Sequence, residues 1–430
     1  MSFPRKRESN YMNKRHRLFF TIIIVVIIMK LALFAFAAIH APQGKILPDS
    51  HDYLRLSDTL ASKGVFAVQY EKGNFIYETL RTPGYPLFLA FFNGVMQIPL
   101  DGVIFLQVII TVLAAFIVYK SALIIDQRIA LLSAAIILLD PPISIFSLLI
   151  LTETLFMFSI SLFMLCFTLY LNSRKLGPLI LSAFMLVIAI YIRPIGYYLG
   201  FAIMLFVIYA NMRENIKRSI VHALIFLAIV YCLLGIWQYR NYVRSGDFAF
   251  SAIERANLSS MGLIKSYARN TDINTKDMAP LPYYANVSFR CLMSLMTRPG
   301  NFKYFGYEPL NLGSFVFSYP WMVFWLSGFI WGIIRIARST VVAQPQDFRG
   351  RAGFGSTSLT IPQTIPSLSR DNLSYLQFML FVTFFFIAIS VVGQMWGVGP
   401  RFRVPMMPFI AIISAYGWTC ILPWFKARNP

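Results

Sequence analysis

The sequence predicts an all-α, polytopic membrane protein, and three bulk properties carry that prediction. Hydrophobic residues make up 57% of the 430 residues, charged residues make up only 13%, and the mean hydropathy is +0.64. A soluble protein carries about a quarter charged residues, which cover its surface. So few charges cannot cover a water-facing surface of this size, whereas lipid tolerates the excess apolar area.

The apolar residues fall into ten runs that we interpret as transmembrane helices. The first, 18–39, follows a basic tail and lacks a small-residue cleavage site, so we expect an uncleaved anchor with a cytoplasmic N-terminus. A shorter run at 84–98 begins between Pro83 and Pro86, and we expect it to lie at the outer interface without crossing. The other nine spans are expected at 102–124, 128–150, 153–171, 177–192, 195–210, 219–239, 316–335, 374–393 and 404–424.

The distribution of charge gives the orientation. A net charge of +20 would also suit a nucleic-acid-binding protein, but the basic residues stand in short clusters between apolar runs. That spacing is typical of cytoplasmic loops under the positive-inside rule. No segment combines a basic face with base-stacking aromatics, so we expect no nucleic-acid partner. The clusters include Lys14, Arg15 and Arg17; Arg174 and Lys175; Arg213, Lys217 and Arg218; and Lys426 and Arg428.

This topology divides the chain into four parts and places both termini in the cytoplasm. A basic tail, 1–17, is expected to be disordered, and residues 18–335 form a transmembrane region with outer loops at 41–82 and 240–315. Residues 336–372, rich in Ser, Thr, Gly, Pro and Gln, are expected to form a flexible cytoplasmic loop, followed by C-terminal transmembrane helices in 373–430. Most carboxylates fall outside, so chemistry is expected on the outer face. The four cysteines and four histidines show no metal-ligand spacing.

The first outer loop holds a carboxylate close to the first span. Asp49 lies about ten residues after that span, so its side chain should lie near the membrane surface. Tyr53, Leu56 and Leu60 recur at helical spacing, which predicts a short amphipathic helix on the interface. Because Asp is a favoured N-cap, Asp49 is either a helix cap or a catalytic carboxylate.

Two further carboxylates stand between long apolar runs. An ionisable group near membrane depth is costly, so Asp140 and Glu153 are functional candidates. Asp140 precedes Pro141 and Pro142, and its structural alternative is to end a helix and face water there. Glu153 starts a span after Thr152, where a helix dipole favours an anion, so structural and functional roles both remain open.

Four arginines stand beside prolines on the predicted outer side. Arginine makes bidentate contacts with phosphate, and its delocalised charge suits a site half in lipid. The alternative is that each guanidinium only reaches lipid phosphates at the membrane surface. These residues are Arg81 in RTPGYP, Arg193 in YIRPIGYY, and Arg401 and Arg403 in GPRFRVPMMP.

The order of these motifs resembles that of bacterial GT-C-fold glycosyltransferases that use lipid-linked sugars. It is most similar to the branch that includes the protein O-mannosyltransferases and the lipid A aminoarabinose transferase. The resemblance implies a GT-C-like bundle of about ten transmembrane helices with extracytoplasmic loops that carry interfacial helices. It runs from Leu18 to Trp424 through PDS-x-x-Y-x-x-L-x-x-x-L, Gly64, RTPGYPLFLA, TE, IRP, RNY-x-x-x-G and RFRVP-x-x-P.

The resemblance implies an enzyme of the bacterial inner membrane that takes a sugar from a polyprenyl phosphate on the periplasmic face. The family's essential loop Asp matches Asp49, and its second acid best matches Glu153, with Asp52 as a further candidate. The basic residue ahead of the family's Pro motif matches Arg81. Ser50 stands where many members have Glu, which argues against protein O-mannosylation and leaves the acceptor open among lipid, glycan and protein.

Such an enzyme must stabilise the departing phosphate and activate an acceptor hydroxyl, and one carboxylate and a phosphate clamp suffice for an inverting single displacement. No nucleotide-sugar site is expected, because a DxD motif with a soluble Rossmann-like domain is absent. No metal is required, although Asp49, Asp52 and Glu153 would form a divalent-metal site if they converged. The expected phosphate-binding residues are Arg81, Arg193, Arg401 and Arg403, and the expected substrate-binding residues are Tyr53 and Tyr85.

Two other functions fit parts of the sequence. A transporter or flippase of an anionic lipid-linked substrate would also use intramembrane arginines and helices broken by proline. A non-catalytic envelope scaffold would use the outer loops only to bind a partner. The large outer loops and the carboxylate near the first span favour the transferase.

Overall fold

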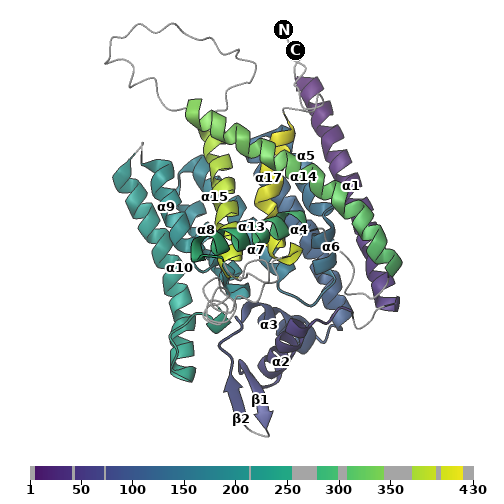
Figure 1. Cartoon of the computed structure of the whole chain (residues 1–430), viewed down its shortest axis with the longest axis vertical. Helices are drawn as coiled ribbons and strands as arrows, with labels where there is room; N and C mark the ends of the chain where they lie inside the picture. Colours follow the sequence, from purple (N-terminus) through teal and green to yellow (C-terminus); the bar gives the residue numbers. More distant parts are fainter. Residues whose placement is uncertain are drawn as a thin grey trace.

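A computed structural model describes residues 5–40, 44–71, 74–212, 215–253, 278–298, 308–342, 370–393 and 399–419. Long helices form a bundle, and a small lobe of short elements lies at one end of it (Figure 1). The lobe consists of α2 (Pro48–Lys63), β1 (Ala67–Glu71), β2 (Asn74–Tyr77) and α3 (Gly84–Leu89), which continues as a π-helix over Ala90–Val95. The other main helices are α1 (Arg5–His40), α4 (Leu100–Ile125), α5 (Gln127–Leu138), α6 (Pro141–Ser147), α7 (Glu153–Ser173), α8 (Leu176–Ile192), α9 (Leu199–Asn211), α10 (Ile216–Ser245), α13 (Pro280–Thr297), α14 (Glu308–Val342), α15 (Arg370–Gly393), α16 (Pro400–Arg403) and α17 (Met407–Trp418).

The long helices make this a multi-pass membrane protein. Within the described ranges, seven helices are long and apolar enough to cross a membrane, or eight if the bent pair α5–α6 is one span. The predicted count of ten is not confirmed. The shortfall comes from α8, which has 17 residues, and α17, which has 12, because a span needs about 20 apolar residues.

The span predicted at 128–150 is broken into α5 and α6, which meet at a bend of 53°. Pro141 and Pro142 open α6, and Asp140 is its N-cap, with a carboxylate oxygen that accepts the Ile143 N–H at 3.3 Å. Asp140 therefore has a structural role, but it begins α6 and does not end a helix as the alternative proposed. The expectation that it faces water is wrong, because only 1% of the residue is exposed.

Two predicted boundaries also differ from the structure. α1 begins at Arg5, so it extends into the tail that was predicted to be disordered; no Gly or Pro interrupts residues 5–18. α14 continues to Val342, past the predicted boundary at 335. The predicted flexible loop beyond it, and residues 254–277 of the second outer loop, lie outside the described residues.

The first outer loop forms the predicted helix and a hairpin that was not predicted. α2 ends at Gly64, whose φ of +66° is the left-handed conformation that glycine adopts without steric cost. β1 and β2 then pair antiparallel. Arg240 of α10 donates to the carbonyl oxygens of Phe66 and Glu78, each at 2.7 Å, so the hairpin is held against the bundle.

A glycine seam joins α14 to α17, in which every residue from Met407 to Gly417 is buried. A methyl group at Gly417 would overlap the carbonyl oxygen of Gly328, and one at Gly332 would overlap that of Ile413. Small residues let helices approach closely in membrane proteins. Because α16 leads into α17, this seam also fixes the place of Arg401 in α16.

Candidate active site

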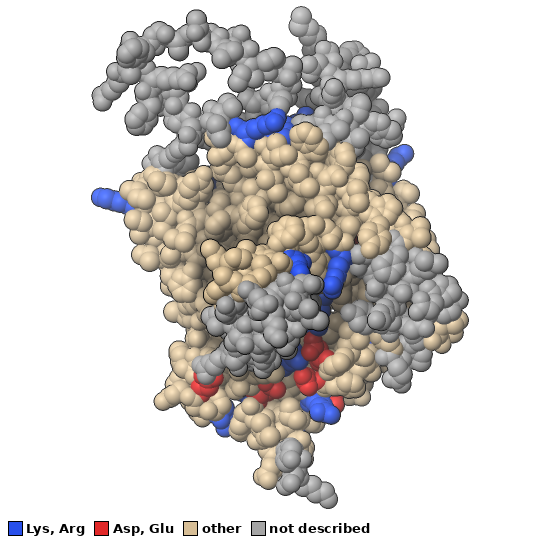
Figure 2. Space-filling model, viewed as in Figure 1, with Lys and Arg blue, Asp and Glu red and all other residues tan. Residues whose placement is uncertain are grey.

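Most of the predicted site residues meet where the lobe joins the bundle. Arg401 is central: its Nη1 lies 2.7 Å from Asp49 Oδ2, and its Nε donates a hydrogen bond to Glu153 Oε1. Arg193, just beyond the C-terminus of α8, donates to the same Glu153 oxygen at 2.7 Å. Figure 2 shows acidic and basic side chains side by side at the lobe end of an otherwise largely uncharged surface.

Arg81, which follows the hairpin, completes this cluster. Its Nη2 lies 2.8 Å from Asp49 Oδ1 and 3.0 Å from Asp52 Oδ2. We call these six residues the charge cluster: Asp49, Asp52, Arg81, Glu153, Arg193 and Arg401. Three guanidinium groups face three carboxylates, so their formal charges cancel.

Asp49 is placed by the start of α2, but it does not cap that helix. The N-cap is Leu47, Pro48 is the first helical residue, and the Ser50 hydroxyl accepts the Leu47 N–H at 2.9 Å. Ser50 also donates to the carbonyl oxygen of Ile150 at 2.8 Å, which ties α2 to the start of α7. The helix-cap alternative for Asp49 is therefore wrong, and its carboxylate instead pairs with Arg81 and Arg401.

Glu153 lies in the first turn of α7 and has no exposed surface. Thr152 is the N-cap residue of α7, although no cap hydrogen bond forms from its side chain. A carboxylate buried this deeply requires counter-charges, because an uncompensated ion in low dielectric is very costly. Arg193 and Arg401 supply them, so Glu153 sets the positions of both guanidinium groups.

The RTPGYP motif locks Arg81 against the end of α8. The Glu78 carboxylate accepts the Arg81 N–H at 3.0 Å, and the Thr82 hydroxyl donates to the carbonyl oxygen of Ile192 at 3.1 Å. A Cβ at Gly84 would lie 2.7 Å from the carbonyl oxygen of Tyr191, so only glycine fits this approach. The motif thereby holds Arg81 beside the segment that carries Arg193.

The electrostatics of the charge cluster favour its ionised form. Burial alone would raise the pKa of Asp49, but the charges of Arg401 and Arg81 outweigh it, and the pKa lies below its ordinary value. Burial alone would lower the pKa of the arginines, but nearby acidic groups outweigh it. Tyr53 and Asp49 raise the pKa of Arg81, and Glu153 and Asp49 raise the pKa of Arg401. Asp49 is therefore an anion at neutral pH.

The structure brings Tyr53 to the charge cluster and places Tyr85 behind it. The guanidinium of Arg81 lies 5.3 Å from the centre of the Tyr53 ring, which packs edge-on against Tyr85 at 5.2 Å. Tyr85 is fully buried, and its hydroxyl donates to Gln107 Oε1 at 2.8 Å. Tyr85 thus supports Tyr53 and is not open to a substrate in this arrangement.

The structure does not bring Arg403 to the charge cluster. Its Nη1 donates to the carbonyl oxygens at the end of α13: Leu295 at 2.9 Å, Met296 at 3.2 Å and Arg298 at 3.1 Å. Residues two apart on a helix do not face the same side, which separates Arg403 from Arg401. We therefore remove Arg403 from the predicted phosphate-binding set and assign it to the C-terminus of α13.

The carboxylates of the charge cluster do not form a metal site as they are arranged. Arg81 occupies one oxygen of Asp49, and Arg401 occupies the other and lies between Asp49 and Glu153. Within the ranges that the structure describes, no group of three or more His, Cys, Asp or Glu side chains is placed to hold a metal ion. The donor set does not fit a divalent cation here.

Two positioning residues escaped the sequence analysis. Ser50 was considered only as a departure from a family pattern, yet it fixes the start of α2. Gln107, fully buried in α4, supports Tyr85 and donates to the carbonyl oxygens of Ser147 and Leu149. The available signal for Gln107 was the single amide side chain within the predicted span at 102–124.

Comparisons with known proteins agree with this architecture. Residues 81–237 match the family described as dolichyl-phosphate-mannose-protein mannosyltransferase. That match includes Arg81, Glu153 and Arg193 and leaves out Asp49 and Arg401. No curated protein matches the chain in sequence.

Among solved structures, the fold is similar to archaeal oligosaccharyltransferase AglB from Archaeoglobus fulgidus, in complex with an inhibitory peptide and a dolichol-phosphate. The TM-score is 0.55 at 14% identity, over 96% of this chain and 52% of that chain, so this chain spans about half the length of the archaeal protein. A complex of the same oligosaccharyltransferase with Zn and sulfate gives a TM-score of 0.51 at 14% identity, and the match covers 93% of this chain and 49% of that chain. ArnT from Cupriavidus metallidurans in the apo state gives a TM-score of 0.44 at 12% identity, and the match covers 95% of this chain and 77% of that chain.

The chain therefore has the fold of the GT-C membrane glycosyltransferases. The resemblance predicted from the order of the sequence motifs is confirmed by the matched family and by this fold. At 14% identity the structural likeness establishes only the fold. The reaction has to be inferred from the chemistry of the charge cluster.

Proposed function

We propose that this protein transfers a sugar from a polyprenyl-phosphate donor to an envelope acceptor by an inverting single displacement. The observation that carries the proposal is the bridge of Asp49 and Glu153 by Arg401, flanked by Arg81 and Arg193. Three guanidinium groups, which we assign to the donor phosphate, thus lie beside a carboxylate that is partly open to water, at one end of the helix bundle. The matched family is named for a dolichyl-phosphate sugar, and the archaeal structure holds a dolichol-phosphate.

The guanidinium groups are suited to the donor's phosphate. As the sugar departs, negative charge develops on the lipid phosphate, and charge-assisted hydrogen bonds from arginine stabilise it. Arg81 also has a spare donor, because its Nε is buried and has no hydrogen-bond partner in the described structure. The donor phosphate would take N–H groups of Arg401 from the carboxylates that hold them now.

Asp49 and Glu153 differ in how far solvent reaches their carboxylates, and this difference suggests different roles. The side chain of Asp49 is 28% exposed, whereas that of Glu153 is not exposed at all. We therefore assign proton abstraction to Asp49 and the positioning of Arg193 and Arg401 to Glu153. When Arg401 turns to the donor phosphate, Asp49 loses one positive partner, its pKa rises, and it becomes a better base.

The displacement balances with these groups alone. The acceptor hydroxyl oxygen forms a bond to the anomeric carbon while the bond from that carbon to the phosphate oxygen breaks. The electron pair leaves with the polyprenyl phosphate, and the hydroxyl proton goes to Asp49. One displacement inverts the configuration of the sugar.

We place the protein in the bacterial inner membrane with the lobe in the periplasm and both termini in the cytoplasm. The support is the positive-inside pattern, which puts the basic clusters on the opposite side from the lobe. The acceptor is an envelope lipid, glycan or protein.

Gene deletion followed by mass spectrometry of envelope glycans and lipid A tests the function. Loss of one sugar from an acceptor, with accumulation of its polyprenyl-phosphate donor and rescue by the wild-type gene but not by Arg401→Gln, supports the transferase. Unchanged glycosylation with an altered distribution of a lipid-linked substrate between leaflets would instead identify a transporter or flippase.

A further inference from the structure

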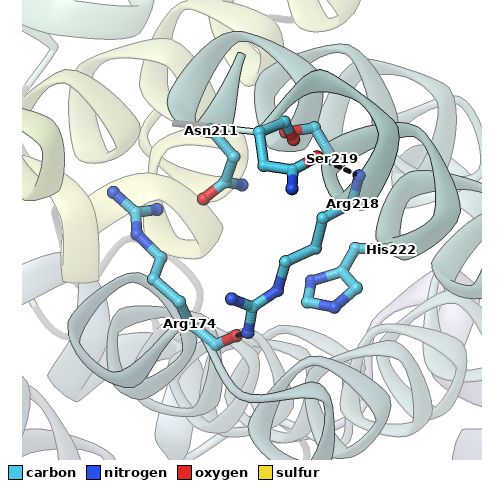
Figure 3. Close-up of a pocket in the computed structure, with 6 residues that line it drawn as sticks. Arg174, Asn211, Arg218, Ser219 and His222 are labelled. Atoms are coloured by element: carbon cyan, nitrogen blue, oxygen red, sulfur yellow. Dashed lines mark hydrogen bonds between the residues drawn. The ribbon is translucent and has the colours of Figure 1, made fainter. Parts of the chain in front are cut away.

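A second basic site lies at the other end of α7. Since α7 has 21 residues and a helix rises about 1.5 Å per residue, this site is roughly 30 Å from Glu153. A cavity of about 70 Å³ forms where the C-termini of α7 and α9 meet the N-terminus of α10 (Figure 3). It is lined by Arg174, Asn211, Asn215, Arg218, Ser219 and His222.

The lining has the chemistry of an anion site. It contains two guanidinium groups, an imidazole, two amides and a hydroxyl, and none of the six residues is acidic. The Asn211 amide already donates to the Tyr170 hydroxyl and the Val207 carbonyl oxygen, and the Ser219 hydroxyl donates to the Asn215 carbonyl oxygen, so the two guanidinium groups are the main donors toward an anion. Arg174 Nη1 is buried and has no hydrogen-bond partner in the described part of the chain. His222 is only 8% exposed, and because its Nδ1 pairs with the Tyr170 hydroxyl at 3.2 Å, Nε2 is the nitrogen left for a ligand.

The backbone around the cavity supports the same reading. Asn215 is the N-cap of α10, and its side chain accepts the Arg218 N–H at 3.0 Å, so the positive end of that helix lies at the cavity. Arg218 Nη2 donates to the carbonyl oxygen of Arg174 at 2.5 Å. Arg174 itself has a φ of +54°, a conformation that a non-glycine residue adopts at some cost. This contact holds the Arg218 guanidinium at the cavity.

We propose that this cavity binds the phosphate of an anionic lipid headgroup, in the leaflet opposite the active site. The cavity is far below the roughly 300–1,000 Å³ of pockets that enclose drug-sized ligands, so it suits one phosphate group and not a sugar. Exposed apolar residues lie close in sequence to the lining residues Asn211 and Asn215, at the end of α9 and the start of α10: Tyr209 at 54%, Met212 at 51% and Ile216 at 46%. Acyl chains would cover these side chains, which favours a lipid phosphate over free phosphate.

The proposal is tested with the purified full chain, by native mass spectrometry during titration with phosphatidylglycerol. Arg174→Gln removes the unpartnered guanidinium, and Lys175→Gln is the matched control, with the same charge change at an exposed neighbour outside the cavity. Loss of a charge-assisted contact should weaken phosphatidylglycerol binding by about 10- to 100-fold in Arg174→Gln and leave the control near wild type.

A parallel titration with inorganic phosphate distinguishes the source of the phosphate. Arg174-dependent phosphate binding that matches phosphatidylglycerol in affinity would support the phosphate chemistry and overturn the lipid as occupant. Equal lipid binding by wild type and Arg174→Gln would overturn the site itself. If Arg174→Gln does not elute as a folded species, Arg174→Lys replaces it: the charge stays but the fork is lost, and severalfold weaker binding is expected.

Discussion

Replacement of Asp49 by Asn separates the charge of this side chain from its packing. In the structure Asp49 accepts from Arg81 at 2.8 Å through one oxygen and from Arg401 at 2.7 Å through the other. Asn offers a single acceptor oxygen, so one contact persists in neutral form and the other is lost. The start of α2 should not change, because Leu47 and Ser50 form its cap.

The expected effects on transfer and on stability differ widely. Loss of a general base typically costs about 100- to 10,000-fold in rate. A hydrogen bond to a charged group contributes about 1.5–3 kcal/mol, and partial exposure of Asp49 reduces that, so the folded protein should lose about 1–2 kcal/mol. Donor binding should persist, because Arg81 and Arg401 are released from their partner.

The assay follows sugar transfer from a polyprenyl-phosphate donor by the purified protein, with donor binding and thermal stability measured on the same samples. Asp126→Asn is the matched control, since Asp126 also pairs with an arginine, Arg128, at 2.7 Å and caps α5. We expect near-wild-type transfer from the control. Wild-type-like transfer by Asp49→Asn would refute the base assignment and direct attention to Asp52.

Four further outcomes are expected. Because the pKa of Asp49 is depressed in the donor-free protein, its ion pairs persist above about pH 4 and are lost only as the pH falls through the folded-state pKa, so thermal unfolding of the donor-free protein measured from pH 8 to 5 should show no loss of stability that depends on Asp49. Arg401→Lys keeps the charge but loses the bidentate fork, and transfer should fall at least tenfold while membrane insertion, checked by fractionation, is unchanged. Gly84→Ala places a Cβ against the Tyr191 backbone and should cost about 1–3 kcal/mol in thermal unfolding, whereas Gly177→Ala, with open space around it, should not. Periplasmic reporters fused after residues 60 and 270 should be active and those after 175 and 350 inactive; an active reporter at 175 would reverse the topology.

The sequence was most informative where a charge stands in an apolar context. Glu153, Arg193 and Arg401 interrupt or border long apolar runs, and burying such a group is costly unless a partner compensates it. That cost makes them recognisable one at a time. Their pairing was not predictable, because it depends on how helices far apart in the chain pack together.

The misses have physical causes of the same kind. Arg401 and Arg403 share one motif, and only the turn of α16 decides that one reaches the charge cluster while the other binds the end of α13. Apolar composition also could not distinguish α8 and α17 from longer spans. A run of apolar residues does not reveal where a proline or the packing of a neighbouring helix ends the helix within it. The hairpin in the first outer loop was missed because its two strands have only five and four residues.

The bridge made by Arg401 has a consequence for how the protein is made. Synthesis proceeds from the N-terminus, so Asp49 and Glu153 reach the membrane long before a residue 248 positions after Glu153. During that interval Glu153 has only Arg193 as a partner among the residues of the charge cluster that it contacts. Under the proposed function, the nascent protein lacks the Arg401 part of the phosphate clamp until α16 reaches the membrane, so a chain truncated before residue 400 should insert as an inactive product.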